Sequence, residues 1–174
     1  MDIQVIGSSS AGNCYRIDDG KTALLLEAGL PIKEIQRSLH FKLSAIAGVL
    51  VSHSHMDHAK SAADMLKAGI EVFGQQETFD ALGLKSHRLR AIIPQVVFQI
   101  GTWTILPFPL EHDCPNVGYL LASGDEKLVY ITDSYYCKYK FNGLTHLMLE
   151  ANHSYAILDE KVKSGELDLK RKNR

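Results

Sequence analysis

Four residues that can bind a metal ion lie within six consecutive positions, directly after an apolar run. The stretch reads VLVSHSHMDHAKS at 49–61 and contains His53, His55, Asp57 and His58. Protonated imidazoles this close repel one another, whereas a shared cation makes their closeness favourable. In extended backbone, residues two apart point to the same side, so His53 and His55 can grip one cation. Asp57 and His58 fall where the chain turns into the next predicted helix, and they can face a second cation.

Two further candidates come at the ends of later predicted strands. His112 follows an apolar strand in PFPLEHDCPNVGY, and Asp133 ends another in KLVYITDSYY. Taken alone, these two are better explained as a loop histidine and a turn-forming aspartate, and Asp57 can be read as a helix cap. Together with the histidine cluster they predict a metal centre. Imidazole and carboxylate ligands favour zinc, manganese or iron over calcium or magnesium.

The composition predicts a soluble protein with one domain, residues 1–174. The chain is 45% apolar and 22% charged, and its net charge of −1 gives no global basic field for nucleic acid. A local basic groove is still compatible with that value. Cys14, Cys114 and Cys137 are odd in number and far apart, which favours reduced thiols in a cytoplasmic protein. The sequence shows no signal peptide, and no run approaches the roughly 18 apolar residues of a membrane span.

The hydrophobic pattern predicts strands with intervening helices in the first half and a β meander in the second. This order is typical of a sandwich whose sheets are covered outside by helices. Residues 22–27 are apolar in sequence and are expected to be buried on both faces. The stretch 86–94 is ambiguous. We expect strands at 3–7, 14–18, 22–27, 47–52, 71–74, 96–101, 102–110, 118–123, 127–133 and 146–152, and helices at 31–41, 58–69, 76–82 and 156–167.

Six segments along nearly the whole chain resemble one family. They are GSSSAGNCY at 7–15, LLLEAGL at 24–30, VSHSHMDHAKS, LEHDCPNVGYLL, VYITDSYY and LMLEANHS at 147–154. With them the chain resembles metallo-β-lactamase-fold hydrolases, and within these the bacterial and phage branch of YycJ-like nucleases. The H-x-H-x-D-H signature, here with Ser52 before it in place of the more frequent threonine, is highly specific for the fold.

The resemblance implies an α/β fold, the metallo-β-lactamase αββα sandwich, with two divalent metal ions, zinc or manganese, iron being a third candidate. It implies that His53, His55 and His112 hold one ion, that Asp57 and His58 hold the other, and that Asp133 bridges them. A water between the ions would attack a phosphodiester of DNA. Asp57 is the candidate catalytic residue, and both metal ligation and proton transfer remain open for it.

Four more residues are candidates for support or substrate contact. Glu27 stands where much of the superfamily has aspartate; it either holds the histidine segment or is an ordinary strand-end carboxylate. Ser9 and Asn13 can offer polar groups to a phosphate, or simply form a tight turn. His153 can contact substrate, although a histidine satisfied by the backbone is the simpler reading. No histidine follows it, whereas the family's last metal histidine comes after a further strand, so we expect a C-terminally truncated domain, either a fragment or a natural short form.

Three functions fit these observations. The first is a metal-dependent phosphodiesterase, an exonuclease acting on DNA. The second is a hydrolase of small esters, thioesters, lactones or β-lactams, because one fold hosts many chemistries. The third is a non-catalytic metal-binding domain with an incomplete second position. The oligomeric state is open.

Overall fold

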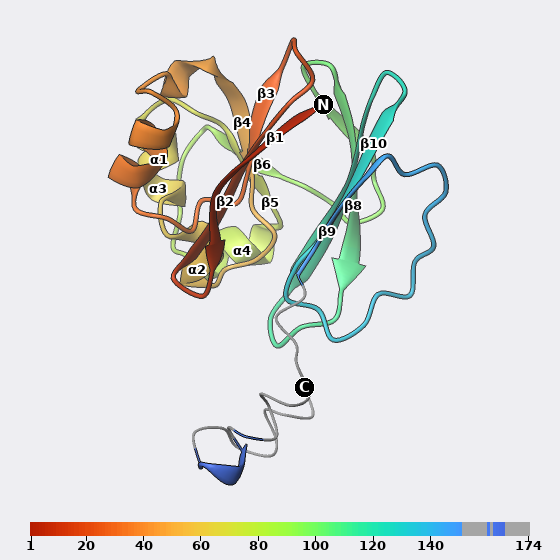
Figure 1. Ribbon diagram of the computed structural model, residues 1–174. Coiled ribbons are helices and arrows are strands. Elements are labelled where there is room, and N and C mark those ends of the chain that lie inside the picture. The colour runs from red at the N-terminus through yellow and green to blue at the C-terminus, as the bar shows by residue number, and fades with distance from the viewer. Residues whose placement is uncertain (151–159, 161, 166–174) are drawn as a thin grey trace.

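The computed structural model describes residues 1–150, 160 and 162–165, and this part of the chain builds two stacked β-sheets (Figure 1). The first sheet contains six strands in chain order, and the second contains five in the order β11-β10-β9-β8-β7. The strands of the first sheet are β1 (Asp2–Ser9), β2 (Gly12–Asp18), β3 (Ala23–Leu26), β4 (Ile46–Leu50), β5 (Val72–Gly74) and β6 (Leu89–Ala91). Those of the second are β7 (Phe98–Ile100), β8 (Trp103–Leu110), β9 (Asn116–Ser123), β10 (Glu126–Ile131) and β11 (His146–Leu149).

Strand direction follows the connections. Short turns join β1 to β2 and β2 to β3, and these pairs are antiparallel. Helical crossovers join β3 to β4 and β4 to β5, which are parallel pairs, and a further parallel pair joins β5 to β6. In the second sheet β7 to β10 form an antiparallel meander, with the predicted hairpins at Gly101 and Gly124. The last strand, β11, lies parallel to β10.

The helices between β3 and β6 lie on the outer face of the first sheet (Figure 1). They are α1 (Ile32–Ser38), the short 3-10 turn η1 (Leu43–Ala45), α2 (Met56–Ala59), α3 (Ala62–Lys67) and α4 (Gln76–Ala81). The outer face of the second sheet is covered differently. There Phe108 and Val129 pack against Tyr139 and Phe141 from the segment that links β10 to β11.

The run of leucines in β3 explains how one strand serves two cores. Leu24 and Leu26 belong to the core between the sheets, together with Trp103 and Tyr119. Leu25, on the opposite face, belongs to the core beneath the helices. All three leucines are fully buried, and each such side chain contributes about 1.5–3 kcal/mol to the hydrophobic stabilisation. This burial on both faces confirms the prediction made from the apolar run.

One predicted helix is wrong in its extent. The pattern at 58–69 indicated a single helix, but α2 ends at Ala59 and α3 begins at Ala62. Ser61 accounts for the break, because its backbone N–H donates to Ala28 O at 2.8 Å and its hydroxyl donates to Leu30 O at 2.6 Å. These tertiary hydrogen bonds override local helix propensity. The predicted helix at 156–167 lies largely outside the described residues.

Asp19, in the turn between β2 and β3, ties the two sheets together. Its Oδ1 accepts the backbone N–H groups of Lys21 at 2.9 Å and Thr22 at 2.7 Å. Its Oδ2 accepts the hydroxyls of Thr102 and Ser123, the latter at 2.5 Å, and both belong to the second sheet or its hairpin. Although its limited burial opposes this, these hydrogen bonds hold the pKa of Asp19 well below its ordinary value of 3.8.

Replacing Asp19 by asparagine is expected to lower the free energy of unfolding by about 1–3 kcal/mol, because several donors lose an ionised acceptor. A lowered folded-state pKa adds stability above the ordinary pKa, and this is lost as pH falls toward the folded value. The decline in stability below pH 3.8 should therefore be shallower in Asp19→Asn than in the wild type. Urea unfolding over that pH range measures both effects. Asp125→Asn, at an exposed turn, is the matched control; equal losses in the two variants would contradict the prediction.

Candidate metal centre

The end of β4 delivers the histidine segment to the rim of the first sheet. His53 is fully buried, and its ring stands with those of His55 and His112 in a triangle. The ring centroids are 4.7 Å apart for His53 and His55, 4.9 Å for His53 and His112, and 5.0 Å for His55 and His112. His112 Nε2 lies 3.2 Å from His55 Nδ1. The structure therefore brings these three predicted ligands together, from two different sheets.

Asp133 joins this triangle to a second group. Its Oδ2 lies 3.1 Å from His58 Nε2, 3.3 Å from His53 Nε2 and 3.8 Å from His112 Nε2. His58 is also buried, and its Nε2 lies 3.5 Å from Oδ2 of Asp57. One carboxylate thus faces imidazoles of both groups. Asp57 lies in the first turn of α2 and not at its N-cap, which is His55, so helix capping does not account for Asp57.

Asp133 is held in an uncommon backbone conformation. Its φ is 46°, in the left-handed region that aspartate tolerates better than most residues. Its backbone N–H donates to Glu150 Oε2 at 2.6 Å, and its carbonyl accepts the side-chain amide of buried Asn116 at 2.9 Å. Glu150 reaches this position because β11 lies beside β10. Two neighbouring strands therefore fix the direction of the Asp133 carboxylate.

Glu27 contacts the histidine segment through Ser52 and His58. It is fully buried, with a φ of 64°, directly after β3. Its Oε2 accepts the Ser52 backbone N–H at 3.1 Å, and its Oε1 lies 3.5 Å from His58 Nδ1. Ser52 in turn has its hydroxyl 2.8 Å from His53 Nδ1. A carboxylate against the far nitrogen of a metal-binding histidine is the usual means of fixing the ring.

Backbone hydrogen bonds make residues 27–29 a junction. Glu27 N–H donates to Leu50 O, Ala28 N–H to His58 O, and Gly29 N–H to Asn13 O, at 2.8, 2.8 and 2.9 Å. Gly29 has no room for a side chain, because a Cβ there would lie 1.6 Å from the carbonyl oxygen of Asp57. The junction therefore connects the histidine segment directly to Asn13 at the start of β2.

Burial and neighbouring charges shift the pKa of four groups in the centre. Burial alone would lower the pKa of His58, but the charge of Glu27 and the hydrogen bond to Asp133 raise it to about 10. Burial would raise the pKa of Asp133, but the nearby imidazoles of His53 and His58 hold it far below its usual range. Burial, with electrostatic repulsion from the neighbouring His53, lowers the pKa of His112. Burial and the proximity of Asp133 raise that of Glu150 to about 7.

Asp113 and Cys114 also lie beside the triangle, and the sequence analysis did not select them. Oδ1 of Asp113 is 3.2 Å from His112 Nε2 and 3.4 Å from His55 Nε2. The Cys114 sulfur is 3.9 Å from His55 Nε2, and burial raises the pKa of its thiol. The signal available in the sequence was their adjacency to His112 in the HDCP segment, two positions apart for the cysteine.

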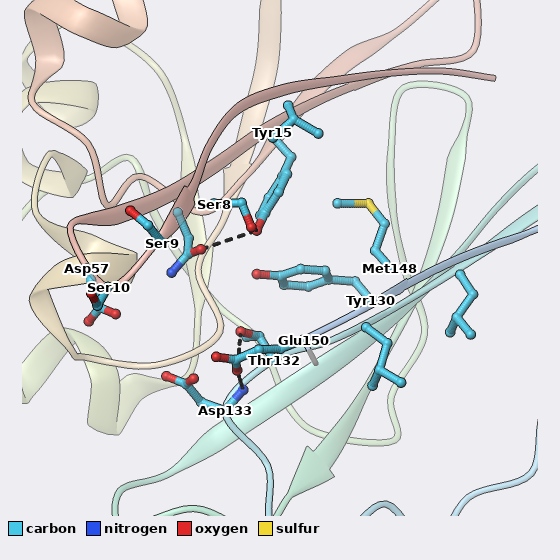
Figure 2. Close-up of a pocket in the computed structure, with 14 residues that line it drawn as sticks. Ser8, Ser9, Ser10, Tyr15, Asp57, Tyr130, Thr132, Asp133, Met148 and Glu150 are labelled. Atoms are coloured by element: carbon cyan, nitrogen blue, oxygen red, sulfur yellow. Dashed lines mark hydrogen bonds between the residues drawn. The ribbon is translucent and has the colours of Figure 1, made fainter. Parts of the chain in front are cut away.

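A cavity of about 440 Å³ opens beside the two aspartates (Figure 2). The loop between β1 and β2 lines one side, and Figure 2 shows the hydroxyls of Tyr15 and Tyr130 pointing into the same part of the cavity. The Tyr15 hydroxyl bonds to Ser8 Oγ at 2.9 Å and to Asn13 Oδ1 at 3.2 Å. Polar lining residues include Ser8, Ser9, Ser10, Asn13, Asp57, Thr132, Asp133 and Glu150.

Asn13 connects this cavity to the imidazoles, because its side-chain nitrogen lies 3.2 Å from His58 Nε2. Ser9 lines the cavity, and its hydroxyl accepts the Ala11 N–H at 3.2 Å, so it also stabilises the turn. The predicted candidate His153 lies outside the described residues. Of the nine other predicted site residues, eight surround one centre or line the adjoining cavity. The ninth, Glu27, lies buried behind His58.

The donor atoms fit divalent metal ions. One donor atom from each of His53, His55, His112 and Cys114 lies within 4.8 Å of the others, and so does one from each of His53, His58 and Asp133. His53 Nε2 is buried and makes no well-aligned hydrogen bond among the described residues, although Oδ2 of Asp133 lies 3.3 Å away. A buried polar nitrogen with no partner is costly unless something binds it, and this set of imidazole, carboxylate and thiol matches zinc-type chemistry.

Comparison with known proteins identifies the class. Residues 24–155 match the family model described as the beta-lactamase superfamily domain. The fold resembles that of the metallo-beta-lactamase fold protein YhfI from Bacillus subtilis, with a TM-score of 0.67 and 22% identity over 78% of this chain and 64% of that one. This chain belongs to the beta-lactamase superfamily. The predicted α/β metallo-β-lactamase fold is confirmed.

Two relatives share more of the sequence. The chain is 27% identical to exodeoxyribonuclease WalJ of Streptococcus pneumoniae, over 88% of this chain and 63% of the relative. It is 24% identical to exodeoxyribonuclease YycJ of Bacillus anthracis, over 91% and 65%. The predicted resemblance to YycJ-like nucleases is thereby confirmed. The chain spans less than two thirds of the length of these relatives. Among the residues that the structure describes, no helix has the length and apolar character needed to cross a bilayer.

Proposed function

We propose that this chain is a metal-dependent phosphodiesterase that degrades DNA from an end, and that it acts in the cytoplasm. One observation carries the proposal: in a chain similar to two exodeoxyribonucleases, a serine-lined cavity adjoins a cluster of imidazoles and carboxylates. The cavity volume of about 440 Å³ is suited to a single nucleotide residue. Its hydroxyls and amide offer donors to phosphate and sugar oxygens.

In this proposal His53, His55 and His112 hold one divalent ion, and Asp57 and His58 hold another. Asp133 faces both groups and is shared between them, as the distances from its Oδ2 to three histidines support. Zinc or manganese, with iron as a third candidate, suits these donors. Such a pair of ions supplies an activated water at neutral pH and offsets charge on a phosphate in the transition state.

The protein residues position the substrate and move the proton. Asp57 lines the cavity, and its carboxylate is partly exposed, so it can orient a water and accept its proton. Ser9 and Asn13 line the same cavity and orient the phosphate. Glu27 keeps the His58 ring in place, because it contacts the nitrogen that faces away from Asp133. Because its pKa is raised, His58 has to release a ring proton before it binds a cation.

Replacing Asp57 by asparagine is expected to lower DNA cleavage by at least about 100-fold, since asparagine has nearly the same size but cannot accept the proton. The substrate is linear double-stranded DNA labelled at one end, and the product lengths are followed with time in the presence of zinc or manganese. Asp64→Asn is the control, because Asp64 is a surface carboxylate in α3 whose ion pair is with Lys67. The control should cleave as fast as the wild type.

Other results would contradict the proposal. Cleavage by the chelator-treated chain at the rate of the metal-loaded chain would exclude the metal mechanism. Rapid hydrolysis of an ester, lactone or β-lactam by a chain that leaves DNA intact would place it among small-molecule hydrolases. Closed circular DNA distinguishes an exonuclease from an endonuclease, because it has no end and an exonuclease leaves it uncut.

A further inference from the structure

Cys114 shares with His112 the bend that directly follows β8. Asp113 between them also contacts His55 and His112, so three consecutive side chains lie beside the histidines. The sulfur of Cys114 belongs to the group of four donor atoms that lie within 4.8 Å of one another, with His53, His55 and His112. Its nearest described contact in that group is His55 Nε2, at 3.9 Å. The Cys114 thiol therefore lies close enough to the three histidines to share one cation with them.

A second observation points to a ligand at this place. His53 Nε2 makes no well-aligned hydrogen bond in the described chain, although it is completely buried and Oδ2 of Asp133 lies 3.3 Å away. The His112 Nδ1 atom is also buried without a partner. Buried polar nitrogens are normally satisfied. A cation between the rings removes the cost at His53, and the Cys114 sulfur, 3.9 Å from His55 Nε2, belongs to the same group of donor atoms.

We propose that Cys114 is a fourth protein ligand of the three-histidine position and makes that position prefer thiophilic cations, zinc and cadmium, over manganese. The inference rests on the metal centre of the proposed function. Three nitrogens and one sulfur form a set that zinc binds in tetrahedral geometry. Thiolates select soft cations, whereas manganese prefers oxygen ligands. On binding, the sulfur releases one proton to solvent and donates its electron pair to the cation, so no oxidant or reductant is needed.

Cobalt(II) replacing the native ion tests the sulfur directly. The chain is stripped with chelator and reloaded with one equivalent of cobalt, and the absorption spectrum is recorded. We expect a near-ultraviolet sulfur-to-cobalt charge-transfer band in the wild type. Cys114→Ser should lose that band and retain the visible bands of cobalt bound to histidines. Cys137→Ser is the matched control and should keep both, because Cys137 packs on the apolar cluster of Phe108, Leu110 and Val129.

The outcomes separate this inference from the proposed function. A wild-type spectrum with visible cobalt bands and no charge-transfer band overturns the role of Cys114 alone. A charge-transfer band that persists in Cys114→Ser does the same. Absence of any cobalt binding by the wild type overturns the metal centre itself, and with it the proposed function.

Selectivity is measured by separate titrations with zinc, cadmium and manganese. Cys114→Ser is expected to weaken the first-bound zinc and cadmium by about 10–100-fold, the usual cost of losing a contributing group at a metal site. Manganese affinity should stay unchanged. Equal loss for all three cations overturns the preference. Alkylation of the wild type adds a readout without any variant: cadmium should protect Cys114 from iodoacetamide and leave Cys137 reactive, and equal labelling of Cys114 with and without cadmium overturns ligation.

Discussion

Replacing both His53 and His55 by alanine is expected to remove one equivalent of metal per chain and to lower DNA cleavage by more than about 100-fold, beyond the usual cost of losing a supporting residue. The reason is geometric. These residues provide two of the three imidazoles in the triangle, and His112 alone, with neighbouring carboxylates, makes a weak site. Elemental analysis after gel filtration measures the metal, and circular dichroism shows whether the fold is kept.

The control for this variant is His40→Asn combined with His87→Ala. Both histidines are exposed, and neither belongs to the metal-binding groups of the described residues. Metal content and cleavage should match the wild type. Unchanged metal content in the His53 and His55 double variant would refute the assignment of these residues as ligands.

Replacing Glu27 by glutamine is expected to lower the free energy of unfolding of the metal-free chain at pH 7 by about 3–5 kcal/mol, because it breaks a buried ion pair with His58. A raised histidine pKa adds stability that is complete below the unfolded-state value of 6.5 and is lost as pH rises toward about 10. Wild-type stability should therefore fall over that range, and Glu27→Gln should show a flatter profile. Urea unfolding in the presence of chelator is the measurement.

Glu77→Gln provides the comparison, since Glu77 is an exposed carboxylate on α4. It should unfold as the wild type does at every pH. If Glu27→Gln and the wild type had the same urea midpoint at pH 7, the buried pair would contribute nothing to folding. Titration of His58 by NMR would give a second measure, because its pKa should fall when the negative charge of Glu27 is removed.

Much of the fold could be predicted from local patterns. Strands β4 and β8 and the hairpins at Gly101 and Gly124 lie where alternation, apolar runs and turn glycines placed them. The break at Ser61 could not be predicted, because it depends on hydrogen bonds to Ala28 and Leu30, more than thirty residues away in sequence. The ambiguous stretch at 86–94 contains β6, whose three residues gain their strand character from pairing with β5.

The candidate centre divides in the same way. The histidine segment could be found from sequence because its donors are adjacent and follow a buried strand. The contact between Glu150 and Asp133 could not be predicted from sequence, because it depends on β11 pairing in parallel with β10. Cys114 was also missed, because its spacing from His112 carries meaning only once β8 and β4 bring both loops to the same rim.

The junction at residues 27–29 has a thermodynamic consequence. It joins His58, through the backbone of Ala28, to Asn13 on the wall of the cavity, through Gly29, and Asn13 also contacts the His58 ring. An ion on His58 and a phosphate held by the serines at 8–10 and Asn13 would thus act on the same hydrogen-bonded junction. Binding linkage requires any such coupling to be reciprocal: if a cation tightens the hold on nucleic acid, nucleic acid tightens the hold on the cation by the same factor. A chain with weak intrinsic affinity for its second ion could then acquire that ion together with its substrate.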